Sequence, residues 1–105
     1  MYTQLFLCTR PGHMSHAEFR SYWRDIHGPI AKRLPGLEEY VQLDAAEDDA
    51  GGWTFDGVAL MTFQDQAAAE TAWASVEGRA TMDDAANFAD LGKLIVLNCD
   101  PARIV

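Results

Sequence analysis

The residues that decide the fold run from Ser15 to Tyr40 and read SHAEFRSYWRDIHGPIAKRLPGLEEY. Ser15 is followed three residues later by Glu18, a capping-box pattern that predicts the start of a helix. Four large apolar residues then recur at helical spacing and are expected to share one face: Phe19, Tyr22, Trp23 and Ile26. We interpret this stripe as core first and as the wall of a pocket second.

The helix is expected to end at His27-Gly28-Pro29. Glycine can adopt the left-handed conformation that closes a helix, and proline pushes the preceding residue out of the α region. A short helical turn would follow, and Tyr40 is expected on the extended segment after it. An ionisable ring is thus fixed where an aromatic helix ends, and His27 with Tyr40 is the first candidate for chemistry.

The rest of the chain repeats the order strand, helix, strand. Residues 2–9, 55–63 and 94–99 are apolar, β-prone runs, and residues 37–45 alternate. Asp65 predicts the cap of a second helix with one apolar face, interrupted at Gly78 and followed by a helical piece over residues 79–88. This order predicts an α+β, ferredoxin-like βαββαβ fold for residues 1–105 as a single domain, with both helices on one face of an antiparallel sheet.

The first, third and fourth strands are apolar on both faces, whereas two helices can cover only one face of the sheet. In a chain of 105 residues the natural cover for the second face is another copy. We therefore expect a homodimer that forms a dimeric α+β barrel. A small-molecule cavity would lie between helices and sheet or inside the barrel.

Composition excludes several classes of protein. A net charge of −8 argues against nucleic-acid binding, which depends on clustered Lys and Arg. No apolar run is long enough to span a membrane, and the N-terminus lacks the pattern of a signal peptide. Cys8 and Cys99 could pair only if their strands are neighbours, and we expect free thiols in a cytoplasmic protein.

His27 and Tyr40 each have a functional and a structural interpretation. An imidazole can take and return a proton near neutral pH, but it can also cap a helix by bonding to freed carbonyls. A tyrosine hydroxyl can donate to a carbonyl or enolate oxygen, but strand tyrosines are common in any sheet. His13 and His16 lie about three helical turns from His27, so no metal is expected.

Trp53 follows an acidic, glycine-rich loop, where so large an apolar residue is costly unless it covers something. Glu38, Asp44 and the acidic residues of this loop are interpreted as a solvated rim. The sequence contains no phosphate-binding glycine motif, no nucleophile elbow and no Cys-x-x-Cys pair, so no cofactor is expected.

The segment RPGHMSHAEFRSYWRDIHGPIAKRLPGLEEYVQ resembles the opening half of EthD-family proteins, which are associated with degradation of ethyl tert-butyl ether. FDGVALMTFQD and EGRATMDDAANF are similar to later parts of that family. The resemblance implies a dimeric α+β barrel and a small organic ligand. In isomerase-like relatives the histidine of the turn and the tyrosine of the next strand are the implicated pair, here His27 and Tyr40. Two departures are the extra His13 and Leu60, which stands where relatives often have an acidic residue.

Two functions fit these observations. The first is a cofactor-independent isomerase, cyclase or dehydratase acting on a small, apolar, oxygenated compound in small-molecule catabolism, with His27 and Tyr40 as catalytic residues. The second is a non-catalytic binding or accessory barrel that supports a neighbouring oxygenase. In either case the expected ligand-binding residues are Tyr22, Trp23, Trp53 and Leu60.

Overall fold

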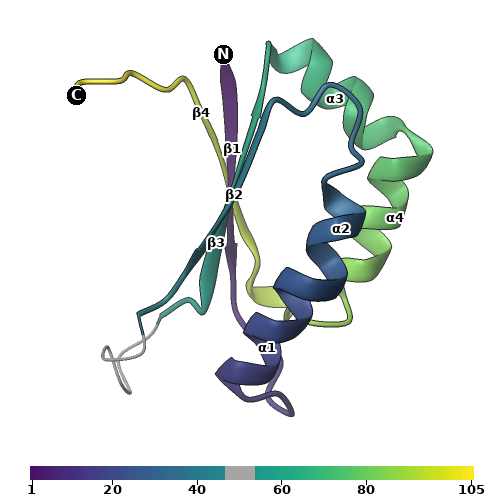
Figure 1. Ribbon diagram of the computed structural model, residues 1–105, viewed down its shortest axis with the longest axis vertical. Coiled ribbons are helices and arrows are strands. Elements are labelled where there is room, and N and C mark those ends of the chain that lie inside the picture. The colour runs from purple at the N-terminus through teal and green to yellow at the C-terminus, as the bar shows by residue number, and fades with distance from the viewer. Residues whose placement is uncertain (47–53) are drawn as a thin grey trace.

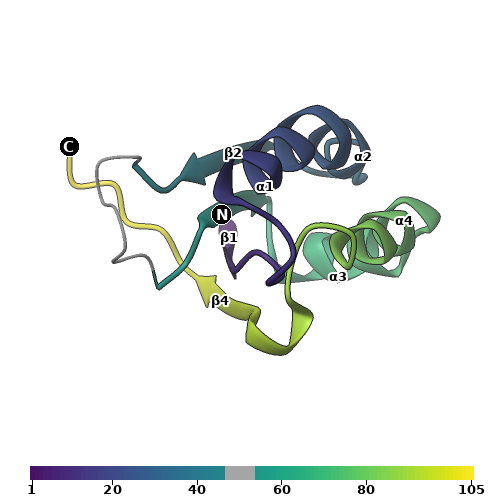
Figure 2. The ribbon, with the colours of Figure 1, turned by 90° about the horizontal axis from the view of Figure 1, so that it is seen from below.

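The computed structural model describes residues 1–46 and 54–105. Its elements follow the order β1 (Tyr2–Cys8), α1 (His16–Tyr22), η1 (Trp23–His27), α2 (Gly28–Ala31), β2 (Glu39–Asp44), β3 (Gly57–Phe63), α3 (Gln66–Ala74), α4 (Val76–Ala85), η2 (Leu91–Lys93) and β4 (Ile95–Cys99). The strands form one antiparallel sheet in the order β2-β3-β1-β4. Helices α1 to α4 all lie on one side of this sheet, as Figures 1 and 2 show. The predicted ferredoxin-like α+β fold is confirmed.

Both predicted helix starts are present. The Ser15 side chain accepts a hydrogen bond from the backbone N–H of Glu18 at 3.1 Å, and the Glu18 carboxylate accepts one from the Ser15 backbone at 2.9 Å. Asp65 caps α3 by accepting from the backbone N–H of Ala68 at 2.8 Å. These bonds satisfy backbone donors that a helix start otherwise leaves without partners.

The first helix does not end at Gly28, and that prediction is wrong. Gly28 has a right-handed φ of −53°, and its N–H bonds to the carbonyl of Trp23, five residues back. This bond closes a π-helical turn, which holds one more residue than an α-helical turn. The extra residue moves Ile26 outward, where it is 49% exposed, and brings His27 inward, where it is 5% exposed. His27 thus takes the inward position that the helical stripe assigned to Ile26.

The second helical segment breaks at Ser75 and not at Gly78. Ser75 ends α3 and caps α4, where its side chain accepts from the backbone N–H of Gly78 at 3.1 Å. A β-carbon at Gly78 would lie only 2.4 Å from the carbonyl oxygen of Ala72. Glycine is therefore needed here because the two helices meet so closely. Val76, the first residue of α4, is exposed.

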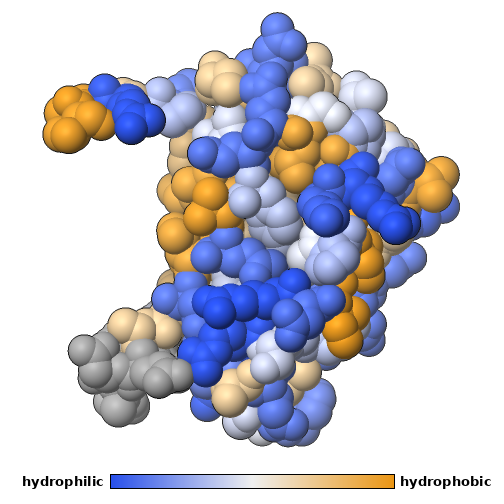
Figure 3. All heavy atoms as spheres, in the orientation of Figure 1, coloured by the Kyte–Doolittle hydropathy of each residue, from blue (hydrophilic) through white to orange (hydrophobic). Residues whose placement is uncertain are grey.

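The strand register separates the sheet into two faces. On the helix side, Phe6, Ala59, Met61 and Phe63 pack under the helices. On the open side, two rows of apolar side chains cross all four strands: Val41, Leu60, Leu5 and Leu97, then Leu43, Val58, Leu7 and Ile95. We call these eight residues the open apolar face. Figure 3 shows apolar surface on the side of the sheet away from the helices.

The alternation in β2 has a consequence for the site. Its apolar residues Val41 and Leu43 belong to the open apolar face, while Tyr40, Gln42 and Asp44 lie under the helices. The polar side of β2 therefore faces the layer where a buried site can form.

Cys8 and Cys99 are both free thiols, as expected. Within residues 1–46 and 54–105, no helix has the length and apolar character needed to cross a membrane.

Candidate functional site

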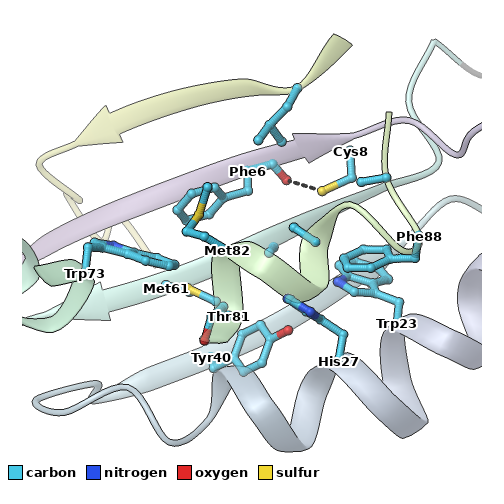
Figure 4. A pocket seen from close by; sticks show the side chains of 14 residues that line it. Phe6, Cys8, Trp23, His27, Tyr40, Met61, Trp73, Thr81, Met82 and Phe88 are labelled. Atoms are coloured by element: carbon cyan, nitrogen blue, oxygen red, sulfur yellow. Dashed lines mark hydrogen bonds between the residues drawn. The ribbon is translucent and has the colours of Figure 1, made fainter. Parts of the chain in front are cut away.

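A cavity of about 40 Å³ lies between the sheet and the helices. Most of its wall is aromatic or sulfur-bearing, and Figure 4 shows these side chains around it: Phe6, Trp23, Met61, Trp73, Met82 and Phe88. Of the described residues that line it, only Met82 is exposed, at 44%. The cavity therefore meets solvent beside Met82 on α4. His27 and Tyr40 line the same cavity.

His27 is held by a carboxylate. Its Nδ1 lies 2.8 Å from an oxygen of Asp84 on α4, and its ring packs on Phe88 with centroids 4.5 Å apart. Burial lowers the pKa of His27 below its usual value, and the hydrogen bond to Asp84 opposes this only in part. At neutral pH the ring is therefore uncharged. With Nδ1–H donated to Asp84, the basic lone pair is on Nε2, which has no hydrogen-bonding partner among the described residues.

Asp84 accepts three hydrogen bonds. Besides His27, it accepts from the hydroxyl of Tyr22 at 2.6 Å and from the side-chain amide of Asn87 at 3.0 Å. Burial alone would raise the pKa of Asp84, but these three bonds together lower it, so the group is a carboxylate at neutral pH. A fixed negative charge beside Nδ1 sets the tautomer of His27 and favours a positive charge on the ring.

Tyr40 presents a hydroxyl whose hydrogen is uncommitted. Its oxygen accepts from the Gln42 side-chain amide at 2.8 Å, and the same amide donates to the carbonyl of Trp23 at 2.9 Å. Burial raises the pKa of Tyr40, and the Gln42 bond offsets only part of this, so the phenol stays protonated. Figure 4 shows the hydroxyl end of Tyr40 directed toward the His27 ring.

The structure brings together only some of the residues expected at the site. His27, Tyr40 and Trp23 share the cavity, while Tyr22 lies behind it and supports Asp84. Leu60 belongs to the open apolar face and does not line this cavity. Trp53 lies outside the described residues. The capping interpretation of His27 is wrong, because its ring bonds to a carboxylate and makes no capping bond.

Asp84 is the residue that sequence reasoning missed. Its signal was present, because Thr81, Asp84, Ala85 and Phe88 recur at i, i+3, i+4 and i+7 and so predict one helical face. An acid within an otherwise buried stripe indicates a carboxylate with an internal partner.

A second polar network lies where β1 ends and α1 begins. Asp56 accepts from the Arg10 backbone at 2.8 Å, from the Arg10 guanidinium at 2.7 Å and from His16 at 2.9 Å. His16 and Arg20 also each lie 3.2 Å from Asp44. Asp44 is therefore enclosed, and its assignment to a solvated rim is wrong. The network joins the ends of three strands to α1, away from the cavity.

No group of three or more His, Cys, Asp or Glu side chains within residues 1–46 and 54–105 is placed to hold a metal ion.

Residues 11–92 match the model of the EthD domain. The chain belongs to the EthD family. An EthD-family protein from Bacillus halodurans superposes with a TM-score of 0.81 at 23% identity, covering 97% of this chain and 99% of that one.

Two other structures share the fold of this EthD protein. A DABB-family protein from Mesorhizobium loti has a TM-score of 0.75 and 17% identity, with 97% of each chain covered. SnoaB from Streptomyces nogalater, described as a cofactor-independent oxygenase, has a TM-score of 0.70 and 17% identity, with 99% of this chain and 95% of that one covered. No curated protein matches the chain.

Proposed function

We propose that this EthD protein is a cofactor-independent enzyme of small-molecule catabolism that moves a proton on a small, largely apolar, oxygenated compound. The observation that carries the proposal is the pairing of a carboxylate-oriented histidine with an uncommitted tyrosine hydroxyl in one apolar cavity. His27 supplies a base at Nε2, and Tyr40 supplies a hydrogen-bond donor. The cavity of about 40 Å³ is smaller than such a compound, so binding must enlarge it. We expect the substrate to enter beside Met82, whose unbranched thioether can move aside.

The chemistry that fits these groups is proton abstraction next to a carbonyl. Nε2 of His27 takes the proton, and the electron pair of the C–H bond moves to the carbonyl oxygen as an enolate. The Tyr40 hydroxyl donates to that oxygen, and the Asp84 carboxylate stabilises the imidazolium. Return of the proton to another carbon completes an isomerisation, while loss of a group from the adjacent carbon completes an elimination.

A non-catalytic binding barrel for a neighbouring oxygenase is the second candidate. It also uses an apolar cavity, but it gives no role to a carboxylate that fixes the tautomer of His27. The description of SnoaB as a cofactor-independent oxygenase supports chemistry without a cofactor within this fold. We therefore favour the enzyme.

The open apolar face supports assembly as a homodimer, which would complete the α+β barrel. Uncovered, its eight side chains form a contiguous apolar surface of the kind that marks an interface. Two proteins of this fold, from Jannaschia and from Bacteroides fragilis, are described as dimeric. We also propose a cytoplasmic location, because free thiols suit a reducing compartment.

The deciding experiment measures hydrogen exchange and needs no knowledge of the product. Lactones, cyclic ketones and conjugated enones are incubated with the protein in D₂O, and loss of the C–H signal next to the carbonyl is followed by NMR. We expect exchange with at least one compound, slowed about 10²–10³-fold in Tyr40→Phe and at least as much in His27→Ala. Tyr2→Phe, a tyrosine of β1 outside the cavity, is the matched control. Equal exchange rates in His27→Ala and the wild type would contradict the proposal.

A further inference from the structure

The indole N–H of Trp23 is an unused donor in the cavity wall. Trp23 is 1% exposed, and its Nε1 has no hydrogen-bonding partner among the described residues. Trp73, which lines the same cavity, differs, because its N–H donates to the Gln4 side chain at 2.7 Å. Among the described residues, Nε1 of Trp23 is not one of the fully enclosed side-chain atoms that lack a partner, so it borders the open space of the cavity, where it can donate to a bound molecule. We expect an acceptor atom of a ligand to receive the hydrogen bond of this N–H.

The orientation of the Trp23 ring is fixed by its surroundings. Its benzene edge lies against Gly57, where a β-carbon would be 2.6 Å from a ring carbon, and its ring packs on Phe19 with centroids 5.3 Å apart. The space left by Gly57 thus holds the benzene edge at β3. Figure 4 shows the indole nitrogen on the edge of the ring that points toward the middle of the cavity.

Trp23 and Tyr40 are joined through one side chain. The amide nitrogen of Gln42 donates both to the Trp23 carbonyl at 2.9 Å and to the Tyr40 hydroxyl oxygen at 2.8 Å. This shared partner ties the Trp23 backbone to the Tyr40 side chain and leaves the hydroxyl hydrogen of Tyr40 uncommitted, while both side chains line the same cavity. Trp23 also begins the π turn that ends at His27, so one turn of helix carries both a donor and the base.

We propose that the Trp23 indole N–H and the Tyr40 O–H form a two-donor site for one ligand oxygen. The inference rests on the proposed function and narrows its substrate class to carbonyl compounds that react through an enolate or phenolate. A carbonyl or enolate oxygen has lone pairs for two donors, whereas an ether oxygen accepts more weakly and carries no developing charge. Trp23 is then a catalytic residue and not only part of the wall.

The first test observes the indole N–H directly. Protein with ¹⁵N-labelled tryptophan is titrated with 4-nitrophenolate, which mimics an enolate oxygen. Signals are assigned with Trp53→Phe and Trp73→Phe. We expect the Trp23 N–H signal to move downfield as the probe binds, while the Trp73 signal, already bonded to Gln4, stays nearly still. An unmoved Trp23 signal at saturation, or no binding of the probe, would overturn the two-donor site.

The second test removes the donor and keeps the shape. Trp23 is replaced site-specifically by 3-benzothienylalanine, which has no N–H, with the same replacement at Trp73 as the control. The readout is the affinity for 4-nitrophenolate relative to 4-nitroanisole. We expect this preference to fall about ten- to hundredfold for the replacement at Trp23 and to stay the same for that at Trp73. An unchanged preference at Trp23 would refute the inference.

These results separate the inference from the proposed function. If Trp23 responds to the probe while His27→Ala leaves hydrogen exchange unchanged, the two-donor oxygen site is supported and proton transfer by His27 is refuted. If His27→Ala and Tyr40→Phe slow exchange but Trp23 does not respond, the enzyme stands with Tyr40 as its donor and the role of Trp23 is refuted.

Discussion

The carboxylate of Asp84 determines which nitrogen of His27 carries a proton. It lies 2.8 Å from Nδ1, and its bonds to Tyr22 and Asn87 hold it in place. A histidine in this position acts as a base only where its ring is uncharged. Because burial lowers the pKa of His27, that form persists to pH values below the usual titration range of histidine.

Asp84→Asn tests this positioning role. An amide can present its N–H₂ to Nδ1, which favours the other tautomer and turns the lone pair of Nε2 into an N–H. We expect the rate of hydrogen exchange to fall about 10²-fold, within the range for general base catalysis. Asp83→Asn, at the exposed neighbouring position, should leave the rate unchanged. Equal effects of the two substitutions would show that Asp84 acts only through net charge.

The pH profile is a separate prediction at this scale. The exchange rate of the wild type should stay level through neutral pH and fall as the pH drops through the lowered pKa of His27. Since Asp84 raises that pKa, its removal should move the acid limb of the residual activity to still lower pH. Rates measured between pH 4 and 8 for the wild type and Asp84→Asn give the acid limb of each protein. A limb that moves to higher pH in the variant would contradict this assignment.

At the scale of elements, the π turn is what places the histidine. An α-helical period predicts Ile26 inside and His27 at a helix end, and it cannot show where one extra residue enters a turn. The strands, their order along the chain and both helix caps follow from local patterns and were predictable. The inward position of His27 depends on the π turn, and its bond to Asp84 joins residues 57 positions apart. Neither follows from local periodicity.

The junction of α3 and α4 gives an element-scale prediction. Gly78→Ala would place a methyl group 2.4 Å from the Ala72 carbonyl, so the helices must separate. In an open helix the same change stabilises by about 1 kcal/mol. Here we expect a net loss of about 1–3 kcal/mol in the free energy of unfolding, as for overpacked sites. Gly12→Ala, with nothing within 4 Å of the new methyl group, is the control in urea denaturation. Equal stability of the two variants would mean that the junction opens freely.

At the scale of the whole molecule, the chain has one covered and one uncovered sheet face. Strands apolar on both sides predicted this, and the register now assigns each side chain to a face. The site lies entirely on the covered face, under the helices. A second copy on the open apolar face would therefore stabilise the sheet that carries Tyr40 without entering the cavity.

Leu97→Glu tests assembly through that face. Leu97 lies on the edge strand β4 and pairs with Leu5 on the open apolar face, so a carboxylate there would be buried against apolar side chains in a dimer. We expect sedimentation velocity to show a dimer for the wild type at micromolar concentration and a monomer for the variant. Val96→Glu is the matched control, because Val96 is the adjacent β4 residue, similarly exposed, but paired with Phe6 on the other face. If both variants dissociate, the edge of β4 and not the open apolar face is the interface. If Leu97→Glu stays dimeric, or the wild type is a monomer, the open apolar face is not where two copies meet.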